Sequence, residues 1–257
     1  MSLLLRGRWP FALCLLLLSF IVSACEREES LSTFVAENEP VYAKGKLAGL
    51  GEVLVRHFFR DQDDGFYLDV GCSHYQDNSA TYYLEEHQNW RGIGVDPIEN
   101  LRPGWAEHRP NSQFFAYAAS DQSGGTLKFY PAGGVSTTEL DDKNLQYWKK
   151  AYEFEPKEIE VPTITLDDLL DQEGVTKVDF LSMDINGAEP IALAGFDIER
   201  FKPDLVAVEA SAHRHRELED YFERHGYVRI PEYLEYDVTN WYYVPASDSP
   251  QADSKSP

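Results

Sequence analysis

The chain has 257 residues, of which 43% are hydrophobic and 13% aromatic, enough for one sizeable domain with a buried core. Acidic residues outnumber basic ones by 44 to 23, giving a formal net charge of -21 at pH 7. Such a charge repels phosphate backbones and argues against nucleic acid as a partner, while solubility alone accounts for an acidic surface.

The N-terminus has the pattern of a secretory signal. Arg6 and Arg8 precede the apolar run Trp9–Val22, which is shorter than the roughly 20 residues that span a bilayer. The run leads to Val22-Ser23-Ala24-Cys25, which resembles a bacterial lipobox. We expect residues 1–24 to be a signal peptide with lipidation at Cys25, or alternatively an uncleaved signal anchor. Both alternatives tether the protein to a membrane with its domain on the exported side, periplasmic or extracellular.

The remaining chain divides by composition. Residues 25–45 are predicted to form a polar tether, residues 46–246 the folded domain, and residues 247–257 a disordered tail rich in Pro and Ser. The folded domain contains Cys72 as its single cysteine, so no disulfide framework is expected. Cys72 has no C-x-x-C partner and is interpreted as a packing residue, so no metal site is predicted.

A helix is expected first, over Lys46–Phe59, from its apolar spacing. The stretch that follows is typical of a βαβ unit. Its parts are a strand at Phe66–Val70, a turn at Gly71, a helix over about Asp77–His87 and a strand at Gly92–Val95.

Ligands of such a unit bind where the carboxyl ends of the parallel strands meet the loops. Gly71 lets the backbone approach a ligand closely, and Asp69 can accept hydrogen bonds nearby. Asp96, about 25 residues after Gly71, lies where an acid binds the two hydroxyls of a nucleoside ribose. The unit therefore predicts a site for a nucleoside cofactor.

Strands and helices continue to alternate. Further strands are expected at Ser112–Ala118, Thr126–Tyr130, Ile159–Thr165, Val178–Ile185, Leu205–Val208, Tyr227–Ile230 and Trp241–Val244. Further helices are expected around Asn144–Tyr152, after Thr165 as N-cap, over Ala188–Ala194 and over His213–His225. Pro162 marks its strand as an edge or bulged one, and Ala132–Leu140 is suited to a loop over the pocket.

This order predicts an α/β domain, doubly wound around a mostly parallel, Rossmann-like sheet with an antiparallel hairpin at one edge. Four predicted strands end in acids, namely Asp69, Asp96, Asp184 and Glu209. Such strand ends project to one rim and can surround one pocket, although each acid alone can also cap a loop. A pocket of carboxylates suits a positively charged ligand, because a cation offsets their mutual repulsion.

Several blocks between about Phe66 and Ser211 resemble the FkbM-type S-adenosylmethionine-dependent methyltransferases in order and spacing. They are Asp69-Val70-Gly71, Ser79-Ala80-Thr81-Tyr82, Trp90 to Pro97, Thr165-Leu166-Asp167, Asp179 to Glu189, and Pro203 with Val208-Glu209. The resemblance implies a seven-stranded class I methyltransferase fold that binds S-adenosylmethionine along the first two strand ends.

In that fold Asp69 and Gly71 would line the methionine side of the cofactor, and Asp96 would bind its ribose. Asp121 is expected near the adenine or, equally, as an exposed turn acid. The family is associated with O-methylation of sugars and small metabolites, which implies a hydroxyl acceptor on a small molecule or glycan.

A hydroxyl acceptor must lose a proton, and Asp184, Glu209 and His213 are the candidate bases. Asp184 is preferred because it ends the central strand opposite the cofactor site. His213 is alternatively part of a solvated helix face. Glu189 either caps its own helix or contacts the substrate.

The chain departs from the family pattern at two places. Ser73-His74-Tyr75 stands where a further glycine is usual, and Asn186 replaces the acid of the Asp-x-Glu-Gly motif. The second departure leaves an alternative function, a membrane-tethered module that binds the cofactor but is impaired in transfer. A nicotinamide-dependent oxidoreductase is disfavoured, since no G-x-G-x-x-G follows the first strand. An active methyltransferase either stays on the cytoplasmic side, where the cofactor is made, or receives the cofactor by transport after export.

Overall fold

The computed structural model describes residues 30–42, 50–132, 136–138, 146, 150 and 157–248. The chain forms two compact units, residues 1–37 and 38–257. In the first, α2 (Leu31–Glu37) is a short helix within the predicted tether. The predicted signal segment, Cys25, most of the helix expected around Asn144–Tyr152 and most of the tail lie outside the described residues. No helix within the described ranges is long and apolar enough to cross a membrane.

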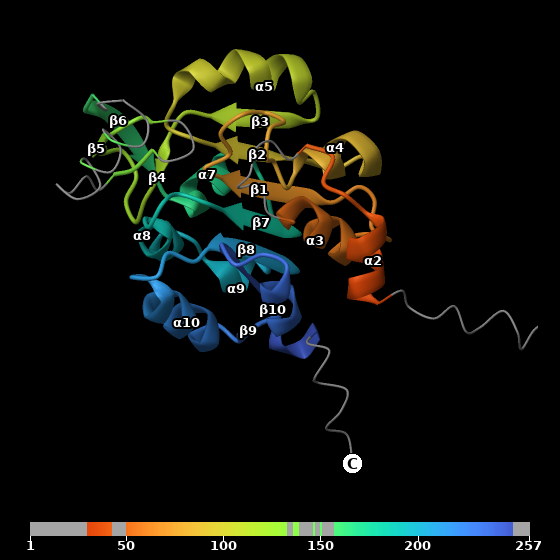
Figure 1. The fold of residues 1–257 in the computed structure, drawn as a ribbon. Helices are drawn as coiled ribbons and strands as arrows, with labels where there is room; N and C mark the ends of the chain where they lie inside the picture. Colours follow the sequence, from red (N-terminus) through yellow and green to blue (C-terminus); the bar gives the residue numbers. More distant parts are fainter. Residues whose placement is uncertain are drawn as a thin grey trace, which may run out of the picture. The chain divides into compact units, whose positions relative to one another are not determined.

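The second unit is built on a seven-stranded sheet in the order β3-β2-β1-β7-β8-β10-β9 (Figure 1). The strands are β1 (Phe66–Val70), β2 (Arg91–Val95), β3 (Ser112–Phe115), β7 (Phe180–Met183), β8 (Leu205–Glu209), β9 (Tyr227–Arg229) and β10 (Asn240–Pro245). Strands β3, β2, β1, β7 and β8 pair in parallel, whereas β10 is antiparallel to both β8 and β9. The predicted fold class, including the antiparallel edge, is confirmed.

The central strands are continuous apolar runs because helices cover both of their faces. In the shared register Leu68 lies between Ile93 and Leu181, and all three side chains are buried. The arrowheads of β1, β2, β3 and β7 in Figure 1 point to the same side, so the ends of these strands form one rim.

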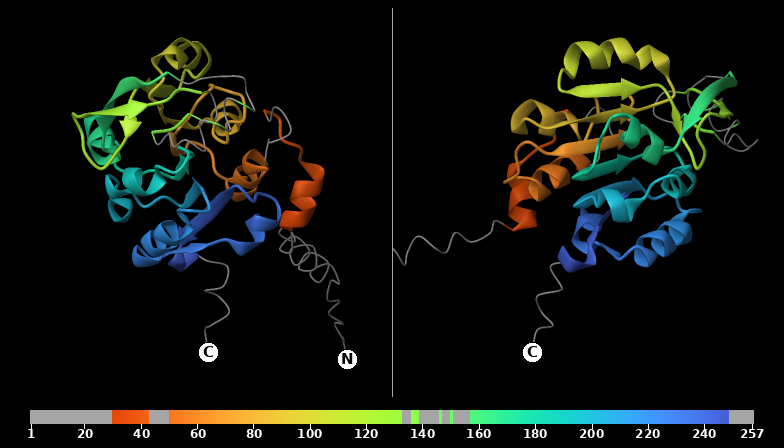
Figure 2. Two further views of the ribbon diagram at one scale, coloured as in Figure 1. Left: turned by 60° about the vertical axis from the view of Figure 1, so that its left-hand side comes forward. Right: turned by 180° about the vertical axis from the view of Figure 1, so that it is seen from behind.

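Two sets of helices enclose the sheet (Figures 1 and 2). The helices are α3 (Gly51–Phe58), α4 (Tyr82–Gln88), α5 (Arg102–His108), α7 (Leu166–Gln172), α8 (Glu189–Ala194), α9 (Ile198–Phe201) and α10 (His215–Arg224), with short 3-10 turns η1 (Glu99–Leu101), η2 (Pro231–Glu235) and η3 (Ala246–Asp248). Apolar residues of α7 to α10 share one core cluster with Val70, Met183 and Val208 of the strands. On the other face Phe59, directly after α3, packs against Trp90 and Phe180 with ring centroids 4.7 and 5.8 Å away.

A second sheet, in the order β4-β6-β5, was not predicted. It contains β4 (Ala118–Ala119), β5 (Thr126–Phe129) and β6 (Ile159–Ile164). The strand expected over Ser112–Ala118 is therefore divided, because the chain turns where Tyr117 N donates to Phe115 O at 3.1 Å. The expectation that Pro162 lies in an edge or bulged strand is wrong, since β6 is the middle strand. The proline is tolerated because β4 pairs only with Thr163 and Ile164, so no partner faces the prolyl nitrogen.

The helix expected from Asp77 begins later, at Tyr82. Ser73 and Asn78 have positive φ angles of 48° and 61°, so residues 72–81 form a loop rather than a helical turn. The predicted N-cap at Thr165 is confirmed, since its Oγ1 accepts from Asp168 N at 3.1 Å.

Candidate functional site

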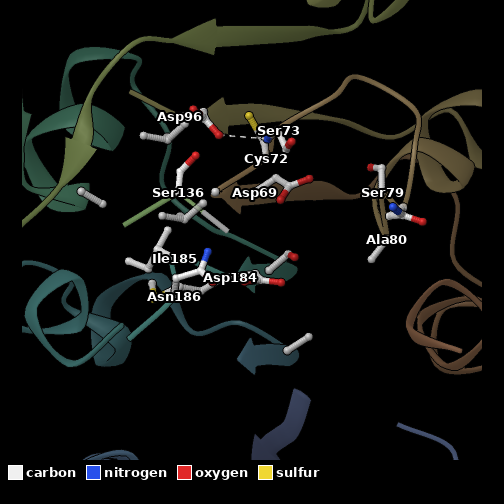
Figure 3. A pocket seen from close by; sticks show the side chains of 18 of the residues that line it. Asp69, Cys72, Ser73, Ser79, Ala80, Asp96, Ser136, Asp184, Ile185 and Asn186 are labelled. Atoms are coloured by element: carbon white, nitrogen blue, oxygen red, sulfur yellow. Dashed lines mark hydrogen bonds between the residues drawn. The ribbon is translucent and has the colours of Figure 1, made fainter. Parts of the chain in front are cut away.

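A cavity of about 550 Å³ opens at the carboxyl ends of β1, β2 and β7. This volume lies within the range of small-molecule and cofactor sites. Asp69, Asp96 and Asp184 all line it, and they come from three different strand ends (Figure 3). The predicted convergence of these acids on one rim is therefore seen, while Glu209 is adjacent to the cavity rather than in its lining.

Asp69 is 6% exposed and lies on β1. Its Oδ2 accepts a hydrogen bond from the Thr81 hydroxyl at 2.7 Å. Burial raises the pKa of Asp69, and the Thr81 hydroxyl, the Arg109 charge and Ser182 act against that rise.

Gly71 directs the chain across the rim. Its φ is +82°, and a Cβ there would lie 1.9 Å from the backbone oxygen of Asp184. Gly71 N also donates to Val95 O at 2.8 Å. Only glycine meets both conditions, because the conformation is left-handed and a neighbouring backbone occupies the side-chain position.

Asp96 follows β2 and is held by the backbone. Its Oδ2 accepts from Ser73 N at 3.1 Å and its Oδ1 from Ile98 N at 2.9 Å. Burial raises the pKa of Asp96 to about 6, and these two hydrogen bonds oppose the shift. Each carboxylate oxygen keeps a further lone pair, as an acceptor of ribose hydroxyls needs.

Asp184 belongs to a group of three carboxyls with Glu189 and Glu209. Asp184 is accessible from the cavity, whereas Glu189 is fully buried. Glu209 makes side-chain contacts at hydrogen-bond range with both of the others. Partial removal from bulk water and the charges of the neighbouring carboxylates raise the pKa of both Asp184 and Glu209. A hydrogen bond between two carboxyls requires a proton on one of them, so the Asp184–Glu209 pair retains a proton when isolated carboxyls are ionised.

Glu189 stabilises the loop after β7 rather than lining the cavity. Its Oε1 accepts from Ile185 N at 2.9 Å and from Gly187 N at 3.2 Å. Its Oε2 is buried without a hydrogen-bond donor, and the same is true of Glu209 Oε2. Among the two alternatives considered for Glu189, these contacts favour the structural role.

His213 and Asp121 are both exposed and do not line the cavity. His213 packs over Gly187, where a Cβ would lie 3.2 Å from the ring Nε2. Asp121 follows β4, and its Oδ1 accepts from the Ser120 hydroxyl at 3.3 Å. The lining of the cavity therefore does not support the roles predicted for His213 as base and for Asp121 near the adenine, and both stay predictions.

The cavity wall includes residues that sequence reasoning missed. Asp237 and Tyr242 form one side, where the Tyr242 hydroxyl donates to Asp237 Oδ2 at 2.8 Å. Ala132, Ser136 and Thr138 also line the cavity, in agreement with the loop predicted there. The sequence did not point to Asp237 and Tyr242, because β10 and the turn before it were interpreted only as part of the antiparallel sheet edge.

The residues present fit an S-adenosyl nucleoside. Two buried carboxylates lie at the ends of the adjacent strands β1 and β2. Asp69 is paired in register with Ser182 of β7, and Asp96 accepts from Ser73 N. The tight turn at Gly71 lies between these two strand ends. Within the described part of the chain, no group of three or more His, Cys, Asp or Glu residues has an arrangement that can hold a metal ion.

Comparison with known proteins identifies the family. A model of the Methyltransferase FkbM domain matches residues 58–229, about two thirds of the chain. None of the curated proteins matches the chain significantly.

Solved structures with similar topology share little sequence. The precorrin-6y C5,15-methyltransferase from Geobacter metallireducens is 13% identical, with a TM-score of 0.41 over 75% of this chain and 85% of that one. A TehB-like SAM-dependent methyltransferase from Corynebacterium glutamicum is 14% identical, with a TM-score of 0.40 over 83% and 93%. The 1,6-didemethyltoxoflavin-N1-methyltransferase from Burkholderia thailandensis, solved with bound 1,6-didemethyltoxoflavin and S-adenosylhomocysteine, is 12% identical, with a TM-score of 0.39 over 94% and 91%.

The family match covers the cavity-lining strand ends of β1, β2 and β7 and the turn at Gly71. The chain belongs to the FkbM methyltransferase domain family, and S-adenosylmethionine is its cofactor.

Proposed function

We propose that the protein methylates a hydroxyl of a small, uncharged or cationic acceptor such as a sugar, with Asp184 as the base. The observation that carries this proposal is the position of Asp184. Its side chain is accessible from the cavity, and its backbone oxygen abuts Gly71 at the cofactor end. In the same proposal Asp69 and Gly71 contact the methionine part of the cofactor and Asp96 its ribose.

S-adenosylmethionine supplies a methyl group bound to a cationic sulfur, and the sulfur is the leaving group when an acceptor oxygen attacks the methyl carbon in line. The protein must hold the acceptor hydroxyl opposite that sulfur and remove its proton. Asp184 can accept the proton when ionised, and Glu209 in its protonated form donates a hydrogen bond to it. The accepted proton then leaves Asp184 for solvent through the cavity.

The charge of the lining supports an acceptor without negative charge. Six acids line the cavity, namely Glu52, Asp69, Asp77, Asp96, Asp184 and Asp237. No Lys, Arg or His occurs among the described lining residues. A phosphorylated or carboxylated acceptor would meet repulsion without a compensating cation.

The test is formation of S-adenosylhomocysteine with matched neutral glycosides, amino sugars and uronic acids. We expect turnover of the first two classes and little of the third. Asp184→Asn is expected to lower turnover by about 10²–10⁴-fold while leaving cofactor affinity nearly unchanged. Asp61→Asn, at a side chain that is 90% exposed, is the matched control. Faster turnover of uronic acids would contradict the acceptor class, and an active Asp184→Asn would contradict the base.

Asn186 makes the impaired binding module the second candidate. Asn186 lines the cavity with a positive φ of 54°, a conformation that Asn adopts more readily than the Glu of the family motif. Cofactor binding without transfer to any acceptor would favour this candidate.

We further propose, from the N-terminal pattern alone, that the domain is tethered on the exported side of a membrane, either through lipidated Cys25 after cleavage of residues 1–24 or through residues 1–24 as an uncleaved anchor. A reporter fused after Pro257 tests this location. Reporter activity on the cytoplasmic side would contradict it and would remove the need for transported cofactor.

A further inference from the structure

Arg109 is a fully buried cation directly after α5, with 0% exposure. Its Nε donates to Glu85 Oε2 at 2.5 Å, and Glu85 is itself nearly buried. Glu85 also accepts from the Ser112 hydroxyl at 2.7 Å and from Asn111 N at 3.0 Å. Burying such a pair is costly, so its presence calls for a use beyond stability.

The guanidinium reaches the first cofactor-side carboxylate through one hydroxyl. Arg109 Nη2 donates to Thr81 Oγ1 at 2.9 Å, and Thr81 Oγ1 donates to Asp69 Oδ2 at 2.7 Å. Arg109 Nη1 donates to the backbone oxygen of Tyr75 at 2.7 Å, in the middle of the loop between β1 and α4. One side chain therefore fixes both this loop and the carboxylate before it.

A second path leads to the other carboxylate. The guanidinium lies over the Trp105 ring at 4.5 Å from its centroid. Trp105 Nε1 donates to Ser73 O at 3.0 Å, and Ser73 N donates to Asp96 Oδ2 at 3.1 Å. Trp105 is 1% exposed, so its ring has little freedom to move independently of Arg109.

We propose that Arg109, acting through Thr81 and Trp105, is a positioning residue that presets Asp69, Asp96 and the loop between β1 and α4 for the cofactor. The inference rests on the cofactor contacts proposed above for Asp69 and Asp96. It also accounts for the Ser79-Ala80-Thr81-Tyr82 block, because Thr81 is the hydroxyl that links Arg109 to Asp69.

The path from Arg109 through Thr81 to Asp69 also acts electrostatically, which distinguishes it from packing alone. Thr81 and Arg109 both favour the ionised form of Asp69 against the effect of burial. The other titratable groups that interact electrostatically with Asp69 are Cys72, Asp96 and Asp184. Replacing the Thr81 hydroxyl by a methyl group should therefore raise the pKa of Asp69 while those three groups stay in place.

The experiment measures S-adenosylmethionine affinity by calorimetry for Thr81→Val, Thr81→Ser and Ser112→Ala. Thr81→Val is expected to weaken binding about tenfold, corresponding to one hydrogen bond to a charged group, and Thr81→Ser to restore it. The loss in Thr81→Val should grow as pH falls, since without the Thr81 hydroxyl Asp69 becomes protonated at a higher pH than in the wild-type protein. Asp96, whose pKa is about 6, titrates in every variant, so the comparison with Thr81→Ser isolates Asp69.

Ser112→Ala is the matched control, because Ser112 contacts Glu85 and Tyr67 in the same buried network without touching the loop. It should lower thermal stability and leave affinity unchanged. Arg109→Lys lacks the planar fork that donates to Glu85, Thr81 and the Tyr75 backbone oxygen together. It should weaken binding and reduce hydrogen-exchange protection of the Ser73 amide.

Two results would overturn the inference. One is a Thr81→Val protein that is folded by circular dichroism and binds like wild type. The other is a loss of affinity that is equal at all pH values and shared by Ser112→Ala, which would mean a structural role only. Asp69→Asn separates this inference from the proposed function, because unchanged binding in that variant would remove the cofactor contact itself.

Discussion

Asp96 shows how burial rather than pairing sets the charge of an acid in this cavity. Two backbone N–H groups favour its ionised form, yet the pKa is raised to about 6 because the carboxyl is removed from water. At neutral pH the group is mostly ionised and can accept strong hydrogen bonds from ribose hydroxyls. Modest acidification is sufficient to neutralise it.

We therefore expect cofactor affinity to fall as pH decreases through about 6, the pKa of Asp96. Asp96→Asn should bind more weakly at neutral pH and lose most of this dependence, because the amide does not titrate. Calorimetric titration of both proteins across this range checks the prediction. A variant that keeps the full pH dependence would assign it to another group.

Gly71 is the residue at which a single methyl group should be most damaging. Gly71→Ala combines a left-handed φ with a clash against the Asp184 backbone, and we expect a loss of about 2–4 kcal/mol in the free energy of unfolding. Gly124→Ala is the control, because φ is +79° there but nothing lies within 4 Å of the added carbon. That control should cost only about 1 kcal/mol. Chemical denaturation measures both, and equal losses would show that the backbone contact is unimportant.

At the scale of elements, the ends of β7 and β8 and the start of α8 bring three carboxyls together. Glu209 ends β8, Glu189 begins α8, and Asp184 follows β7 between them in the fold. The parallel pairing of β7 with β8 places Asp184 and Glu209 at one rim. Glu189 is held there by the backbone N–H groups of residues 185 and 187.

The raised pKa of Glu209 makes stability depend on pH. The folded state retains a proton that the unfolded state has already released, so stability is lost as pH rises from the ordinary Glu value toward the raised one. Glu209→Gln keeps a hydrogen-bond donor without titrating. We expect the variant to gain thermal stability relative to wild type as pH rises through that window. A constant difference between the two melting temperatures would contradict the raised pKa of Glu209.

For the whole molecule, the sequence predicted those features that depend on residues close together in the chain or on a regular apolar pattern. Apolar runs at β1, β2 and β7 specify a parallel sheet, and parallel strands place Asp69, Asp96 and Asp184 at one rim without knowledge of any contact. The Thr165 cap is likewise a local feature of four residues.

The rest depended on contacts between distant residues. Strand β4 has two residues, too few for any periodicity, and it exists because β6 pairs with it. Arg109 would be placed on the surface by composition, yet Glu85 and Thr81, more than 20 residues earlier, hold it in the core. The elevated pKa of Glu209 arises from burial beside Asp184 and Glu189, and no pattern along one strand reveals it.

Six carboxylates around one cavity also bear on how the protein exchanges its spent donor. The donor arrives with a sulfonium charge and departs as a neutral thioether, so the surrounding field favours the incoming molecule over the outgoing one. S-adenosylhomocysteine should therefore compete poorly with fresh donor, and product inhibition should be slight. The acids proposed above to bind the cofactor would then also help to clear the site after each turnover.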